Sequence, residues 1–170
     1  RWIAEGAKYE KHWAYQVPVK GAVPDSAGWG VNAIDAFAYG PMTMAGLTPQ
    51  KEADKETLIR RVTIDITGLP PTVEEVEAFL GDDSDNAYPK LVDRLLASPR
   101  YGERMAAWWL DGARYGDSHG YDNDLENAQW PWRNWVIDSF NANQSYDQFT
   151  VEQLAGDLLP DATDDQILAT

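Results

Sequence analysis

The sequence of 170 residues contains no cysteine. Disulfide bonds, thiolate metal sites, cysteine nucleophiles and covalently attached c-type haem are therefore excluded for this chain. A run of about 18 apolar residues is also missing, so we predict no membrane span. Basic residues are scarce, because 14 Lys and Arg accompany 28 Asp and Glu and the net charge is −14. A chain this acidic repels phosphate backbones, so no nucleic-acid partner is expected.

Hydrophobic residues make up 44% of the chain and charged residues 25%, which is typical of a globular protein with a sizeable core. Phenylalanine is rare, with four residues, whereas tryptophan and tyrosine contribute eight each. Both of these larger rings combine an apolar body with a polar group. They serve in cores, at interfaces and as platforms on which sugar rings stack.

Proline and glycine are concentrated near the N-terminus, which predicts an extended arm over residues 1–30. We interpret this arm as a linker from an upstream domain that the chain does not contain. The chain opens on Arg1 rather than Met, so it is expected to be a piece of a longer protein. Residues 31–170 are predicted to form one helical domain.

Apolar residues recur at helical spacing through residues 31–170, and capping residues precede most of these segments. The predicted helix starts lie at Asn32, Asp54, Thr72 with Glu75, Ser98 with Pro99, Pro131, and Ser145 with Gln148. The Gly40–Pro41 pair is expected to interrupt the first helix, and residues 116–129 are expected to form a loop. The predicted fold is all-α, an irregular bundle of about six or seven short helices with an extended N-terminal arm.

Four sequence blocks in order carry a family resemblance. They are residues 58–72 (LIRRVTIDITGLPPT), 98–104 with 109–111 (SPRYGER and WLD), 130–137 (WPWRNWVI) and 153–160 (QLAGDLLP). Together they resemble the domain of unknown function found in planctomycete cytochrome C-type proteins, over roughly residues 30–170. In that family the module follows an N-terminal cytochrome-like domain.

The resemblance implies a large, exported parent protein, periplasmic or extracellular, with several domains. The expected partners are the upstream cytochrome-like domain and a further module downstream, and haem is expected only on the upstream domain. Expansion of the family in bacteria that degrade complex polysaccharides also suggests a polysaccharide ligand. Electron transfer would then belong to the haem domain rather than to this chain.

The loop between the two tryptophan-rich helices is the richest segment in polar chemistry. Its carboxylates at Asp117, Asp122, Asp124 and Glu126 could converge on a hard cation such as Ca²⁺, which takes oxygen ligands. The spacing does not match an EF-hand, and the alternative is a solvated acidic loop. A zinc or iron site is disfavoured because the loop holds one histidine.

Four further side chains in or beside this loop are candidate ligand contacts, namely Arg114, His119, Tyr121 and Trp130. Tryptophans at helical spacing are usually core residues, so the neighbouring Trp109 and Trp132 are expected to be buried. Trp130 and Tyr121 flank the loop and are the better candidates for stacking on a sugar.

Three functions remain open from the sequence. The favoured hypothesis is a non-catalytic module that docks a haem domain or binds a glycan or protein partner, with Ca²⁺ organising the loop. The second is a metal-assisted enzyme acting on polysaccharide through loop carboxylates, and the third is a structural spacer. A binding module requires Trp130 or Tyr121 exposed near a cleft, an enzyme requires paired carboxylates, and a spacer would bury the aromatic rings.

Overall fold

The computed structural model describes residues 1–170, which divide into two compact units, residues 1–51 and 52–170. Eight α-helices and two short 3₁₀ helices make up the regular structure, and there is no β-strand. The predicted all-α fold is confirmed. No helix combines the length and the apolar character that crossing a membrane requires.

The N-terminal unit contains one 3₁₀ helix, η1 (Trp13–Tyr15), and one α-helix, α1 (Ala33–Met44). Asn32 caps α1 as predicted, but the helix continues through the Gly40–Pro41 pair, so the expected interruption is wrong. Pro41 removes only its own N–H, and its carbonyl oxygen still accepts a hydrogen bond from the next turn, at 3.1 Å from the Ala45 nitrogen. The division into units falls after Lys51 and groups α1 with the arm, whereas composition placed the boundary after residue 30.

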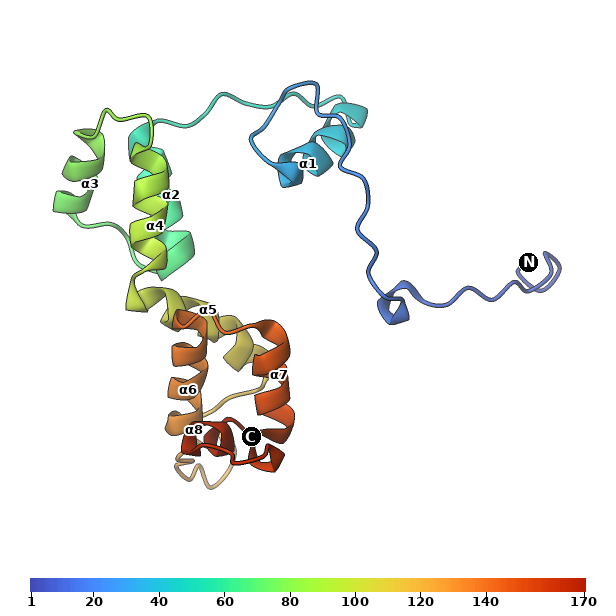
Figure 1. The fold of residues 1–170 in the computed structure, drawn as a ribbon, viewed down its shortest axis with the longest axis vertical. Helices are drawn as coiled ribbons and strands as arrows, with labels where there is room; N and C mark the ends of the chain where they lie inside the picture. The colour runs from blue at the N-terminus through green and yellow to red at the C-terminus, as the bar shows by residue number, and fades with distance from the viewer. The chain divides into compact units, whose positions relative to one another are not determined.

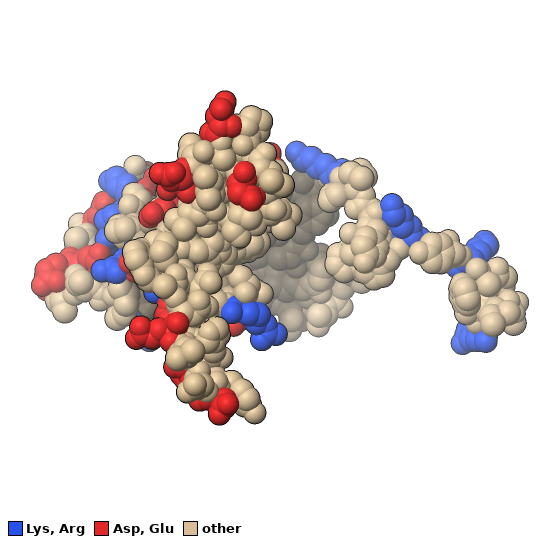
Figure 2. Space-filling model, turned by 90° about the horizontal axis from the view of Figure 1, so that it is seen from below, with Lys and Arg blue, Asp and Glu red and all other residues tan.

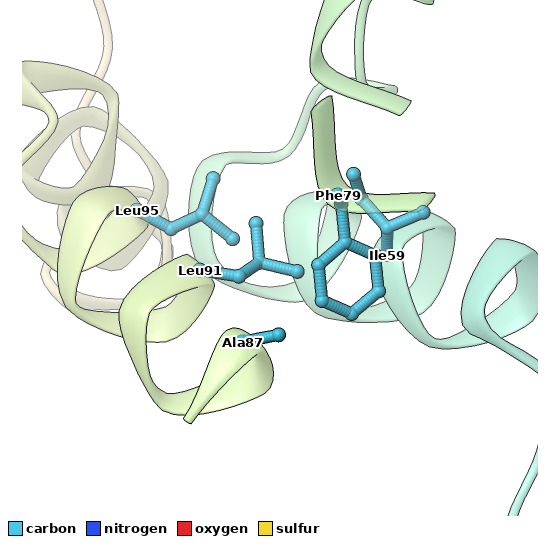
Figure 3. Packing of buried hydrophobic residues seen from close by; sticks show 5 residues of the cluster. All are labelled: Ile59, Phe79, Ala87, Leu91 and Leu95. Carbon is cyan, nitrogen blue, oxygen red and sulfur yellow. The ribbon is translucent and has the colours of Figure 1, made fainter. Parts of the chain in front are cut away.

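The second unit begins with three helices that share one hydrophobic cluster, α2 (Lys55–Thr67), α3 (Val73–Leu80) and α4 (Ala87–Leu96). Figure 3 shows its buried members meeting between the three helices, Ile59 from α2, Phe79 from α3, and Ala87, Leu91 and Leu95 from α4. The predicted starts at Asp54 and Thr72 are confirmed by side-chain caps. Gly68 ends α2 in a left-handed conformation, with φ of 76°, which glycine adopts without strain.

Helices α5 (Pro99–Gly112) and α6 (Trp130–Asn141) form the closest pair in the unit. Ser98 caps α5 with proline in its first turn, as predicted. The two helices approach at Gly102, whose N–H donates to the Asn141 side-chain oxygen at 2.8 Å. A second hydrophobic cluster begins here, with Ala106 from α5 and Trp135 and Val136 from α6.

Two further α-helices and a 3₁₀ turn complete the second unit, α7 (Tyr146–Ala155), η2 (Gly156–Leu158) and α8 (Asp164–Ala169). Phe149 and Ala169 add α7 and α8 to the second cluster. Figure 1 shows α6 and α7 beside one another with α8 at one end, and α8 contacts both helices. The predicted capping box at Ser145 is not formed, because the Ser145 side chain makes no cap hydrogen bond.

Candidate ligand-binding groove

A buried carboxylate on α7, that of Glu152, is surrounded by polar side chains. Glu152 is only 5% exposed, and no cation is paired with it. Three glutamine side chains donate amide hydrogens to it instead. Gln144 bonds Oε2 at 2.6 Å, and Gln148 and Gln166 bond Oε1 at 3.1 and 3.0 Å. A buried negative charge is therefore balanced by neutral donors alone, which is rare because burying an ion is costly.

Local helix geometry explains how three donors reach one carboxylate. Gln148 and Glu152 lie four residues apart on α7, so they share one helix face. Gln166 comes from α8, where it also forms a capping box with Thr163 that sets the start of that short helix. The cap of α8 and the solvation of Glu152 therefore depend on the same glutamine side chain.

Two opposed effects act on the ionisation of Glu152. Burial raises the pKa of the carboxyl group, and the hydrogen bonds from Gln166, Gln148 and Gln144 lower it further than burial raises it. The net result is a pKa below the ordinary glutamate value of 4.5. Glu152 is consequently ionised at neutral pH.

An open groove of about 540 Å³ lies over this carboxylate between α6, α7 and α8. Its lining combines amide groups, carboxylates, hydroxyls and two tryptophan rings. The polar residues are Asn134, Asp138, Ser139, Gln144, Gln148, Glu152, Thr163, Asp165 and Gln166, and the tryptophans are Trp130 and Trp135. Trp130 is 54% exposed, whereas Trp135 is buried in the hydrophobic cluster. The groove thus offers one accessible ring beside many hydrogen-bonding groups.

The charge of the groove has one sign, since three carboxylates line it and no Lys or Arg does. Most acidic residues of the chain lie in residues 52–170, and Figure 2 shows them in several separate groups over the surface. The potential in the groove is therefore expected to be negative, favouring neutral or cationic ligands over anions.

Two tryptophan side chains and one glutamine hold α8 in place beside the groove. The Trp132 indole N–H donates to the Ala169 carbonyl oxygen at 3.1 Å, and Gln153 donates to the same oxygen at 2.6 Å. The Gln153 side-chain oxygen accepts from the Trp109 indole N–H at 2.9 Å. The groove wall formed by α8 is thus fixed to α5, α6 and α7 through one chain of hydrogen bonds.

A family model matches residues 33–170, which is most of the chain. The chain belongs to the PSCyt2 family of proteins of unknown function (DUF1549). Comparison with curated proteins and with solved structures gives no match. The geometry of this PSCyt2 domain is therefore the main guide to its function.

The predicted calcium ligands of the PSCyt2 domain lie in the loop before α6, but they do not converge. No three His, Asp or Glu side chains anywhere in the structure are close enough to hold a metal ion. Asp117 accepts a hydrogen bond from the Tyr115 hydroxyl and lies 3.9 Å from an Arg133 nitrogen. Asp124 accepts from the Gly120 N–H at 2.7 Å, and hydrogen bonds from Ser118 and Gly120 lower its pKa.

The other two predicted ligands have different surroundings. Asp122 has a left-handed backbone, with φ of 51°, and Glu126 pairs through its backbone with Ser118 in an isolated antiparallel bridge. The four carboxylates are therefore distributed along an irregular loop. Calcium binding stays a prediction from the sequence, and it would require the loop to rearrange.

Of the four predicted ligand contacts, Trp130 alone lines the groove. Tyr121 is 86% exposed in the loop, and His119 is also exposed. Arg114, with φ of 60°, lines a separate cavity of about 460 Å³ together with Trp132 and Gln153. The structure thus separates Trp130 from the other three candidates.

The glutamines around Glu152 were missed by sequence reasoning. Gln148 was interpreted as part of a capping box, and α8 with its Gln166 was not predicted. Two signals were available, the spacing of four residues between Gln148 and Glu152, and the Thr163-x-x-Gln166 pattern, which is typical of a capping box. Neither signal reveals that both glutamines reach the same carboxylate.

Proposed function

We propose that this domain is a non-catalytic binding module of a larger protein and that the groove over Glu152 holds a neutral glycan. The observation that carries the proposal is the exposed Trp130 ring at a groove of about 540 Å³ lined by amides and carboxylates. The spacer alternative would bury the aromatic rings, whereas Trp130 is 54% exposed.

Sugar chemistry matches this lining in two ways. The C–H face of a sugar ring is apolar and stacks on an aromatic side chain, which Trp130 offers at the groove edge. Sugar hydroxyls both donate and accept hydrogen bonds, so they pair with side-chain amides and carboxylates. Asn134, Asp138 and Asp165 line the groove in exposed positions suited to such pairs.

The negative charge of the groove restricts the class of glycan that it is expected to bind. Uronate and sulfate groups would enter a groove that holds three carboxylates and no basic side chain. Like charges in such a site cost binding free energy, so the ligand is expected to be uncharged.

Glu152 does not suit the role of a catalytic acid. Glycosidases need a carboxylic acid whose raised pKa keeps a proton available at working pH. The pKa of Glu152 is lowered, and its two oxygens already accept three hydrogen bonds. Glu152 is therefore suited to act as a fixed negative charge and not as a proton donor. The alternative of a metal-assisted enzyme using loop carboxylates has less support, because no three of the chain's carboxylates gather where they could hold a metal ion.

The wider context of the proposal comes from the family resemblance. We propose an exported parent protein in which this module stands between a cytochrome-like haem domain and a downstream module. The haem-docking alternative would gain support from an exposed His12 or Met105, and of these His12 is exposed whereas Met105 is half-buried. Glycan binding has the further support of a groove with an exposed ring, Trp130, in its lining.

The proposal is tested by calorimetry on the full 170-residue chain. Neutral probes are cellohexaose and xylohexaose, and the anionic probe is an alginate oligosaccharide of similar length. We expect saturable binding of a neutral probe and weaker binding of the anionic one. Trp130→Ala should weaken the neutral probe about tenfold, the order that loss of an aromatic stacking contact gives.

Trp108→Ala is the matched control, because Trp108 is 68% exposed and does not line the groove. Its affinity should equal that of the unaltered protein. An absence of binding to both neutral probes, or an equal loss in the two variants, would overturn the assignment of the groove. Preference for alginate would overturn the charge argument.

The calcium prediction is tested separately after chelator treatment. If the loop is organised by Ca²⁺, the unaltered protein gives a saturable heat that Asp122→Ala/Asp124→Ala loses. Because no three carboxylates are gathered in advance, we expect weak binding accompanied by ordering of the loop. No heat in either protein would rule out the calcium site.

A further inference from the structure

A second cavity adjoins the groove. Its volume is about 340 Å³, and Ser139 and Gln144 line both cavities. Five aromatic residues surround it, Tyr101 and Trp109 from α5, Phe140 from α6, and Tyr146 and Phe149 from α7. We call this cavity the aromatic pocket.

The rings of the aromatic pocket are held at different angles, so they do not simply stack. The Trp109 and Phe149 centroids are 5.0 Å apart with an angle of 80° between their planes. Phe140 and Phe149 are 5.8 Å apart at 51°. Phe149 is buried and fixes this arrangement, whereas Tyr146 is 75% exposed at the rim. Phe149 also stacks on Trp135, with 5.2 Å between centroids and 23° between planes, so Trp109, Phe140 and the two tyrosines supply the other ring surfaces of the pocket.

Three polar residues besides the tyrosines line the wall, Ser139, Asn143 and Gln144, and two of them donate hydrogen bonds to other residues. The Ser139 hydroxyl donates to the Trp135 carbonyl oxygen at 2.8 Å, and the Gln144 amide donates to Glu152 at 2.6 Å. No Lys, Arg, Asp or Glu lines the aromatic pocket. Recognition of a ligand there therefore rests mainly on the aromatic rings.

Electrostatics distinguishes a cation from a neutral apolar ligand. Aromatic faces carry negative charge density and attract a cation within about 6 Å of the ring centroid. Across Gln144 lies the ionised Glu152, so the surrounding field also favours positive charge. An ammonium ion that carries alkyl groups suits walls that offer few hydrogen-bond acceptors.

We propose that the aromatic pocket is a binding site for an alkylammonium cation of the trimethylammonium type. This site is distinct from the glycan groove and does not depend on Trp130. Two sources share this chemistry, a small solute such as choline and the headgroup of phosphatidylcholine. The pocket volume of about 340 Å³ suits a small solute, which is the source that we propose.

The test compares choline with 3,3-dimethylbutan-1-ol, a neutral molecule of the same shape. Binding to the full chain is followed by NMR, and the Trp109 indole N–H is the reporter because it belongs to a ring of the pocket. We expect saturable shifts with choline and at least about threefold weaker binding of the neutral molecule. Equal affinity for the two would overturn the cation proposal, as would the absence of saturable shifts with choline.

Variants at the rim locate the site without disturbing the core. Tyr146→Ala should weaken choline binding at least about threefold, whereas Tyr146→Phe keeps the ring and should retain it. Tyr101→Ala and Tyr101→Phe provide a second pair on α5. Unchanged affinity in both alanine variants would place choline elsewhere and overturn the assignment.

Two further measurements are needed. One distinguishes the two sources of the ligand, and the other tests the aromatic pocket independently of the groove. Phosphatidylcholine vesicles should not bind the chain, and vesicle binding lost in Tyr146→Ala would overturn the small-solute assignment. Trp130→Ala should retain choline binding, since Trp130 does not line the aromatic pocket. The groove proposal can thus fail while this one stands, and the reverse also holds.

Discussion

The close approach of α5 and α6 at Gly102 makes a strong prediction about stability. A Cβ atom at this position would lie 2.5 Å from the Ile137 carbonyl oxygen and 2.5 Å from the Asn141 side chain. Asn141 cannot move freely, because it accepts from the Gly102 N–H at 2.8 Å and donates to the Pro99 carbonyl oxygen at 3.2 Å. Gly102→Ala must therefore displace the α6 backbone at Ile137 and move Asn141 out of both hydrogen bonds.

The magnitude follows from three contributions. Overpacking a tight contact costs about 1–3 kcal/mol, and each lost hydrogen bond costs about 1 kcal/mol. The higher helix propensity of alanine offsets about 1 kcal/mol of this cost. We expect Gly102→Ala to lower the free energy of unfolding by roughly 2–4 kcal/mol, close to 10 °C or more in Tm for a unit of this size.

Gly112 provides the matched control, because it is also in α5 and a Cβ there would meet nothing within 4 Å. Gly112→Ala should leave stability unchanged or raise it by up to about 1 kcal/mol. Urea unfolding followed by tryptophan fluorescence measures both variants. Equal stability of the two would refute the close approach, and with it the position of α6 at the groove.

Two further predictions concern ionisation. The pKa of Glu152 is lowered in the fold, so its contribution to stability is complete above about pH 4.5 and is lost as the pH falls through the lower folded-state value. The unfolding free energies of the unaltered protein and Glu152→Gln should therefore differ more at pH 7 than at pH 3, and a constant difference would contradict this. Asp82 should titrate at about 2 by NMR because Ser84 and Lys90 stabilise its carboxylate, and Ser84→Ala should return its pKa toward 3.8; an unchanged value would exclude the Ser84 contribution.

Helix starts were the part of the fold that sequence reasoning predicted best. Asn32, Asp54, Thr72 and Ser98 all cap helices through their side chains, as their patterns indicate. Capping is a local interaction between residues two or three positions apart, so it can be predicted from a single sequence. Ser145 fits the same pattern but makes no cap hydrogen bond, and its side chain hydrogen-bonds the Asp147 carboxylate instead.

The candidate site was predicted only at Trp130, and the reason is physical. Glu152 has no distinguishing local pattern among 28 acidic residues. Its role depends on donors from the segment before α7, from α7 and from α8, which tertiary packing brings together. The carboxylates of the acidic loop suggest a metal site because they are close together in the sequence. In the structure they lie along an irregular loop and do not converge.

The position of Gln144 connects the two proposed sites. This side chain lines both cavities and donates to the buried carboxylate, so a change in its rotamer would alter the charge balance of the groove and the wall of the aromatic pocket together. A cation in the aromatic pocket would further stabilise ionised Glu152, and Glu152 would in turn favour the cation, because linkage is reciprocal. We therefore expect choline to change the glycan affinity. An affinity that is the same with and without choline would show that Gln144 is a rigid wall between independent sites.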